Sequence, residues 1–284
     1  MGQPEKPQLP FHEDFYYPFE YNLENIEACF LNCLNKSKFQ PEDKERVSVA
    51  LAEAKKLHEN QTRVEAQGLP YVVHPIEVAL EVLKLGGSPN TVIAALLHDV
   101  REDVDFMRRL ENGEVAEKFG SRVVELLTRL LSKYRLEFFG ISGKFKGCFA
   151  YFFERALLKL LPNEAQVVRL TDSAYFKKLE GDATAVFIKA IDRRKNLMSL
   201  GRMLDGVLDH PTSDPAGIIN FVRKQITQTK DFVLPAVYRK YATLAYNLEA
   251  LNLKLEIRLK IAEAFTAEST AQSSEFPVSR QLCV

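Results

Sequence analysis

The chain has 284 residues, and its 38 Lys and Arg residues balance 38 Asp and Glu residues, so its formal net charge is zero. This balance argues against binding to nucleic acid or to an anionic membrane through bulk charge. With 46% hydrophobic and 27% charged residues, the composition is typical of a globular protein and excludes collagen-like and wholly disordered chains.

No apolar run reaches the roughly 18 residues that a membrane span requires. The first 20 residues are rich in proline and acidic side chains, where a signal peptide would be apolar. Four cysteines are too few for a disulfide scaffold and fit a reducing compartment. We therefore expect a cytoplasmic protein with no nucleic-acid partner and no membrane partner.

Apolar residues recur at three- and four-residue spacing along most of the chain, and proline, glycine and serine mark the expected helix ends. Alternating, β-branched segments are almost absent, so we expect an all-α fold. Helices are predicted over residues 25–34, 41–57, 75–85, 91–103, 115–133, 150–161, 176–200, 215–248 with a kink or break near Pro235, and 251–265.

The same patterns divide the chain into four parts. We expect an N-terminal extension at 1–40 and a helical core at 41–205, with an insertion at about 136–171. The helices of 206–267 are expected to pack on this core. The last part, 268–284, is polar and has few apolar anchors, so it is predicted to be disordered.

An unusual group of polar residues lies at the end of the helix predicted over 91–103. His98 and three carboxylates, on Asp99, Glu102 and Asp103, stand within six residues at the end of an apolar stretch. Burying such groups is costly unless a cation compensates for their charge. One interpretation is a metal site, and the other is a solvated helix end in which His98 only packs.

Two further segments favour the metal site. His74 stands directly before a proline at a helix start, where we expect it to be extended. Far downstream, Lys189, Asp192 and Asn196 share one helical stripe. Two imidazoles and two carboxylates would then form a mixed nitrogen and oxygen ligand set, which suits Mn²⁺ better than a closed zinc site. This set contains His74, His98, Asp99 and Asp192.

Cationic side chains surround Asp192 in the sequence. They are Lys189, Arg193, Arg194 and Lys195. Some of them are candidates for binding phosphate, Lys189 among them, but four cations this close together are also typical of a solvated helix face.

Three motifs together resemble one known family. The segments YVVHP (71–75), AALLHDVRED (94–103) and IKAIDRRKN (188–196) are similar to those of HD-superfamily metal phosphohydrolases. More narrowly, they resemble the (p)ppGpp hydrolase domain of the Rel/SpoT family, over roughly residues 42–260. The resemblance implies an HD-domain helical bundle. Because the chain ends before a nucleotide-synthesising domain would begin, we expect a stand-alone small alarmone hydrolase.

The resemblance also implies roles for individual residues. His74, His98, Asp99 and Asp192 would bind a Mn²⁺ ion. Glu102 and Asp103 would position and activate the attacking water, and Asn196 would help to hold the diphosphate.

Two more substrate contacts follow from the family pattern. Arg63 is the candidate for contacting the base, although it lies further from His74 than the pattern expects. Without a gap in the alignment, Glu65 would take the place of that arginine. Ser199 stands where the family often has threonine and is either a ribose or phosphate ligand or a surface hydroxyl.

The function that this resemblance implies is removal of the 3′-diphosphate from (p)ppGpp, which gives GDP or GTP and pyrophosphate. An adenosine alarmone or NADPH is an alternative nucleotide substrate, and a non-catalytic nucleotide-sensing HD module is an alternative of a different class. The aromatic-rich insertion at 136–171 is interpreted as a lid, as the surface of a homo-oligomer, or as a hairpin that only adds core.

Overall fold

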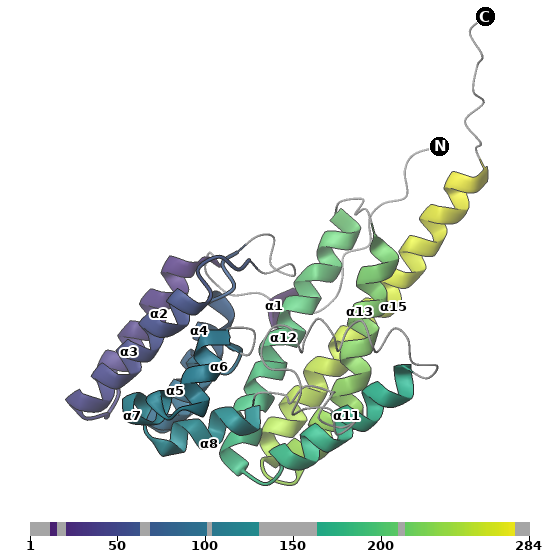
Figure 1. Cartoon of the computed structure of the whole chain (residues 1–284). Coiled ribbons are helices and arrows are strands. Elements are labelled where there is room, and N and C mark those ends of the chain that lie inside the picture. Colours follow the sequence, from purple (N-terminus) through teal and green to yellow (C-terminus); the bar gives the residue numbers. More distant parts are fainter. Residues whose placement is uncertain are drawn as a thin grey trace, which may run out of the picture.

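The computed structural model describes residues 12–15, 21–62, 69–100, 104–130, 164–209 and 214–275. These residues form helices and no strand, and their only β-type contact is an isolated bridge between Thr62 and Pro70. The predicted all-α fold is therefore confirmed (Figure 1). The helices are α1 His12–Phe15, α2 Leu23–Lys36, α3 Pro41–Leu57, α4 Val73–Lys84, α5 Pro89–Leu96, α6 Val104–Glu111, α7 Glu114–Phe119, α8 Ser121–Leu130, α11 Glu164–Leu179, α12 Ala183–Asp209, α13 Pro215–Gln228, α14 Leu234–Tyr238 and α15 Ala242–Glu275.

The helices form two groups that meet at α12. Figure 1 shows α2 to α8 on one side and α11, α13 and α15 on the other, with α12 between them. α12 packs against α4 of the first group and runs along α15 of the second. None of the helices that the structure describes is long and apolar enough to cross a membrane.

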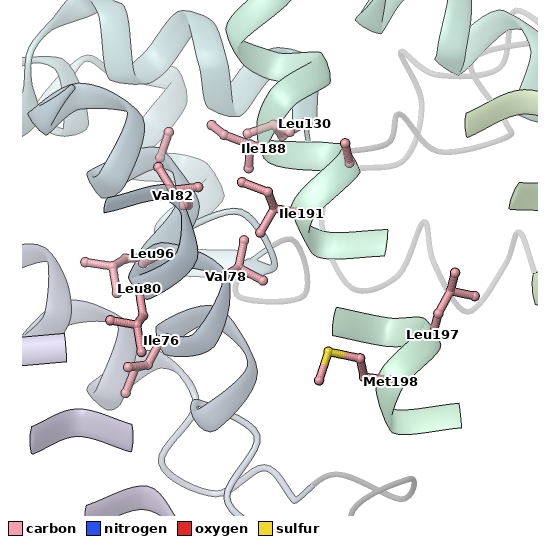
Figure 2. Packing of buried hydrophobic residues seen from close by; sticks show 14 of the residues in the cluster. Ile76, Val78, Leu80, Val82, Leu96, Leu130, Ile188, Ile191, Leu197 and Met198 are labelled. Atoms are coloured by element: carbon pink, nitrogen blue, oxygen red, sulfur yellow. The ribbon is translucent and has the colours of Figure 1, made fainter. Parts of the chain in front are cut away.

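The contact between α4 and α12 is the part of the core that positions the site. Figure 2 shows Val78 and Val82 of α4 close to Ile188 and Ile191 of α12, and all four side chains are fully buried. Burying an aliphatic side chain of this size stabilises a fold by roughly 1.5–3 kcal/mol. Two helices far apart in the sequence are thus held in one relative position.

Several helix ends lie where sequence signals place them. Ser88 caps α5 by accepting a hydrogen bond from the Thr91 amide, and Pro89 is the first helical residue. Gly86, with φ of +82°, adopts the left-handed conformation that favours glycine and ends α4. The next amide, on Gly87, donates to the Val82 carbonyl at 2.8 Å.

The helix predicted over 91–103 is shorter than expected. α5 ends at Leu96, and residues 97–99 form a turn. Leu97 and Val100, which follow the helix end, are also apolar and buried. The apolar pattern therefore continues past the helix, and periodicity could not reveal the break. His98 and Asp99 therefore lie in a turn and not on a helix.

Two other predicted helices are each divided in two. The helix expected over 115–133 breaks at Gly120, which has φ of +88° and lies between α7 and α8. The helix expected over 176–200 breaks before α12, where the carboxylate of Asp182 accepts from the amides of Thr184 and Ala185. A glycine and a capping carboxylate mark these two breaks in the sequence, but the prediction followed the apolar periodicity instead.

The C-terminal helices confirm the predicted break near Pro235. A π-helical turn, Thr229–Val233, directly precedes α14, because proline offers no amide hydrogen to continue the regular pattern. Beyond it α15 is one continuous helix through Glu275, which includes residues 268–275 of the segment predicted to be disordered. The division of the chain into four parts stays a prediction.

The N-terminal segment is anchored on the C-terminal helices. Phe15 is fully buried, with the guanidinium of Arg258 above its ring at 4.6 Å from the centroid. On the facing helix, a Cβ atom added to Gly201 would lie 2.1 Å from the ring. Arg202 also donates to the Phe15 carbonyl at 2.7 Å. Gly201 is therefore required for Phe15 to lie against α12.

Two sequence predictions fall outside the described residues. They are the helix at 150–161 and most of the aromatic insertion at 136–171.

Candidate metal centre

Three separate elements supply the four predicted ligands. His74 lies in the first turn of α4, and Asp192 lies in the middle of α12. His98 and Asp99 lie in the turn that follows α5. Because α4 contacts both α5 and α12, the fold brings these residues together despite their separation along the chain.

The prediction that His74 is extended is wrong. α4 begins at Val73, so His74 is helical, and its amide donates to the Tyr71 carbonyl at 3.1 Å. Pro75 is tolerated because the amide hydrogens of a first helical turn have no acceptor within the helix. The restriction that proline places on the preceding residue is only a preference, and here the helix start overrides it.

The four side chains converge on one small region. Nε2 of His74 lies 3.0 Å from Oδ1 of Asp192, and Nε2 of His98 lies 3.5 Å from the same oxygen. Oδ2 of Asp99 is 3.7 Å from both imidazole nitrogens. His74, His98 and Asp99 each offer one ligand atom, and these atoms all lie within 4.8 Å of one another. The arrangement is compatible with a divalent metal ion between them.

The hydrogen bonding of His98 tests whether a cation fits this site. Its Nδ1 donates to the Ala95 carbonyl at 2.7 Å, which leaves a lone pair on Nε2 in the neutral ring. Nε2 is buried and has no hydrogen-bond partner among the described residues, while oxygens of Asp99 and Asp192 face it. A lone pair opposite two carboxylates is stable only with a positive charge between them. The donor set therefore fits a metal ion.

The pKa values point in the same direction. Burial opposes protonation of His98, but Asp99 and Asp192 overcome this and raise its pKa from 6.5 to about 9. Although burial also opposes ionisation of Asp99, the two imidazoles lower its pKa to about 2. Lys189 and the imidazoles hold the pKa of Asp192 well below its usual range, again against burial. The site thus stabilises positive charge at the imidazole nitrogens.

Lys189 and Asn196, both predicted to contact substrate, contact Asp192. Nζ of Lys189 lies 2.6 Å from Oδ2 of Asp192, one turn away on α12. The amide of Asn196 donates to Oδ1 at 2.7 Å. The Asp192 side chain is only 3% exposed, and these contacts fix its orientation.

Asp99 is held differently, by a residue to which the motif analysis assigned no role. The hydroxyl of Tyr71 donates to Oδ2 of Asp99 at 2.8 Å, and the Asp99 side chain is 32% exposed. Tyr71 lies three residues before His74 in the YVVHP segment. That spacing at a helix start is the signal that could have placed it beside the site.

The cations that follow Asp192 pair with side chains of neighbouring helices. Arg194 and Lys195 both contact Glu81 of α4. Arg193 is buried, and its guanidinium donates to Gln225 and Gln228 of α13. The interpretation of this group as a solvated face is therefore wrong for the buried Arg193 and Lys195.

The remaining predicted site residues differ in what the structure says of them. Ser199 is buried, and its hydroxyl donates to the Lys195 carbonyl at 3.2 Å and accepts from Arg202 at 3.0 Å. Its role as a substrate ligand stays a prediction. Arg63, Glu102 and Asp103 lie outside the described residues.

Part of the chain is similar to a known domain family. Residues 50–139 match a family model described as an HD domain, a range that includes His74, His98 and Asp99 but ends before Asp192. A guanosine-3′,5′-bis(diphosphate) 3′-pyrophosphohydrolase of Aquifex aeolicus is 41% identical over 87 residues, which are 31% of this chain and 12% of that protein.

Two further relatives carry similar names. The bifunctional (p)ppGpp synthase/hydrolase SpoT of Escherichia coli is 35% identical over 101 residues, or 35% of this chain and 14% of the relative. A guanosine-3′,5′-bis(diphosphate) 3′-pyrophosphohydrolase of Haemophilus influenzae is 29% identical over 154 residues, or 53% of this chain and 18% of the relative. The chain therefore spans less than a fifth of the length of these relatives.

A solved structure is also similar. It is described as a metazoan ortholog of SpoT that hydrolyzes ppGpp, and it is 20% identical with a TM-score of 0.49, covering 76% of this chain and 96% of the other. The family match and the sequence relatives agree with the motifs from which the resemblance was drawn. Residues 50–139 therefore resemble an HD domain, and the chain is similar in sequence to parts of proteins named as (p)ppGpp hydrolases.

Proposed function

We propose that this protein is a Mn²⁺-dependent phosphohydrolase that removes the 3′-diphosphate from (p)ppGpp and releases pyrophosphate with GDP or GTP. The observation that carries the proposal is the convergence of His74, His98, Asp99 and Asp192 from three elements. The names of the sequence relatives support the substrate class. Two nitrogen and two oxygen donors support a divalent ion such as Mn²⁺ over a closed zinc site.

His74, His98, Asp99 and Asp192 would hold the ion. The ion would supply Lewis acidity, which lowers the pKa of water towards neutrality and offsets negative charge on the phosphoryl oxygens. Lys189 and Asn196 keep the Asp192 carboxylate in place, through Oδ2 and Oδ1 respectively. Ala95 fixes the tautomer of His98 by accepting from its Nδ1.

The remaining roles concern the proton and the substrate. In this proposal Glu102 and Asp103 accept the proton of the attacking water and position it, a task suited to carboxylates next to a metal ligand. Arg63 contacts the purine base. Asn196 and Ser199 contact phosphate or ribose oxygens, and in the case of Asn196 this would be in addition to its bond with Asp192.

A substrate panel with Mn²⁺ tests the reaction, with pyrophosphate and inorganic phosphate measured separately. Release of pyrophosphate from ppGpp is the expected result. Pyrophosphate from an adenosine alarmone but not from ppGpp, or inorganic phosphate from NADPH, would instead indicate another nucleotide. Tight nucleotide binding with no turnover of any substrate would contradict an enzymatic function.

Two alanine variants test the division of roles. Asp99→Ala should lose both Mn²⁺ binding and activity. Glu102→Ala should keep Mn²⁺ and lose turnover, because its proposed partner is the water. Equal loss of metal in both variants, measured by calorimetric titration, would overturn the assignment of roles.

A further inference from the structure

The two carboxylates of the metal centre are fixed by different groups. Asp192 is buried on a long helix, and Lys189 and Asn196 contact both of its oxygens. Asp99 lies in the turn after α5 and is 32% exposed, so its backbone is not held by a regular helix. Its Oδ2, the atom that faces both imidazoles, accepts the hydroxyl of Tyr71 at 2.8 Å.

Tyr71 is itself held in place. Its ring packs against the buried imidazole of His58, with centroids 5.0 Å apart and planes at 34°. Its backbone amide donates to the carbonyl of Gln61 at 2.8 Å, and Nδ1 of His58 lies 2.8 Å from Oε1 of the same glutamine. The ring also meets His74 edge to face at 6.4 Å. The hydroxyl is therefore aimed by a fixed ring.

We propose that Tyr71 is a positioning residue that orients the Asp99 carboxylate towards the two imidazoles, an inference that rests on the proposed metal-dependent function. A tyrosine hydroxyl has one hydrogen to donate, and donating it to Oδ2 leaves further lone pairs on that oxygen for a cation. Groups that orient a metal ligand typically contribute 10–100-fold to metal affinity. Tyr71 acts through Asp99 and does not itself touch the ion.

Substitution Tyr71→Phe tests this role. The phenylalanine ring keeps the contact with His58, and Asp99 can exchange the lost hydrogen bond for water because it is partly exposed. The fold should therefore survive. A matched control is Tyr238→Phe, which removes a tyrosine hydroxyl that donates to another carboxylate, that of Glu249, on the C-terminal helices.

The measurement is calorimetric titration of the metal-free full chain with MnCl₂, together with the unfolding temperature of each metal-free protein. The Kd for Mn²⁺ should rise by about 10-fold or more in Tyr71→Phe and stay within 2-fold of wild type in Tyr238→Phe. The unfolding temperatures of the two metal-free variants should be similar. Activity of Tyr71→Phe should recover as Mn²⁺ is raised towards saturation, which a general structural fault would not allow.

Three results would contradict these proposals, and they separate the positioning role of Tyr71 from the proposed function. An unchanged Kd in Tyr71→Phe, with wild-type binding intact, would overturn the positioning role alone. Equal weakening in Tyr238→Phe would do the same, because the effect would then not be specific to Asp99. Failure of the wild-type chain to bind Mn²⁺ at all would overturn the proposed function.

Discussion

The two sides of the candidate metal centre contrast in how they are built. On one side, Asp192 is part of α12, whose neighbouring residues Ile188 and Ile191 are buried against α4. On the other side, Asp99 follows the end of α5, in a turn, with about a third of its side chain exposed. One proposed ligand is thus placed by a packed helix and the other by a turn and a single tyrosine hydroxyl.

This difference has an energetic meaning. A ligand on a packed helix cannot move without disturbing the core, whereas one in a partly exposed turn can shift at small cost. Asp192 should therefore contribute to both stability and metal affinity. Asp99 should contribute mainly to metal affinity.

Alanine substitution of each carboxylate tests this contrast with the largest expected effects. Both Asp192→Ala and Asp99→Ala should abolish measurable Mn²⁺ binding. Asp192→Ala should also lower the free energy of unfolding of the metal-free protein by about 2 kcal/mol, because Lys189 and Asn196 lose their shared partner. Asp99→Ala should lower it by less, because Asp99 is partly exposed and water can reach the groups that lose it as a partner.

Urea unfolding of the metal-free proteins measures this difference. Equal destabilisation by the two substitutions would show that the two sides are built alike.

The acidity of His98 predicts how metal binding depends on pH. Its pKa, raised to about 9 by Asp99 and Asp192, means that the ring is protonated at pH 7–8 and must lose this proton to bind a metal ion. Affinity for Mn²⁺ should thus rise by about tenfold per pH unit up to pH 9. Calorimetry at pH 7.5 in two buffers of different ionisation enthalpy should report release of about one proton. Binding without proton release would contradict the raised pKa.

Substitution Asn196→Ala tests whether Asn196 acts on Asp192 or on the substrate. If Asn196 mainly orients Asp192, the Kd for Mn²⁺ should rise by about tenfold or more. If it mainly binds the diphosphate, KM should rise and metal affinity should stay as in wild type. Parallel metal titration and steady-state kinetics separate the two effects.

A further prediction concerns a position outside the candidate metal centre. Gly201→Ala on α12 should destabilise the protein by about 1–3 kcal/mol, because the added methyl group would collide with the ring of Phe15. Gly206→Ala on the same helix has open space and should be neutral or stabilising by up to about 1 kcal/mol. Thermal unfolding of both variants checks this, and similar melting temperatures would contradict the packing of Phe15 against α12.

Sequence reasoning predicted the fold class, and it grouped four residues that the structure brings close together. Ser88 with Pro89 marks a helix start, and Gly86 marks a helix end, through local backbone preferences that the fold does not override. The grouping of His98 and Asp99 with the distant Asp192 came from ligand chemistry and then from motif resemblance, since no periodicity connects segments so far apart in the chain.

What could not be predicted depends on tertiary contacts. The end of α5 at Leu96 is hidden because Leu97 and Val100, on either side of His98 and Asp99, are also apolar and buried. The partners of Lys189 and Arg193 are set by helix packing and not by their local sequence. The sequence alone therefore left two interpretations of the cations around Asp192, a phosphate site and a solvated helix face. The contact of Tyr71 with Asp99 requires the turn geometry that the sequence does not show.

A crystal structure of the Mn²⁺-loaded protein, with the ion located by its anomalous scattering, tests the central claim most directly. We expect one ion within coordination distance of Nε2 of His74, Nε2 of His98 and a carboxylate oxygen of both Asp99 and Asp192. An ion bound elsewhere, or one that leaves two of these four side chains out of its coordination sphere, would contradict the metal centre proposed for this protein.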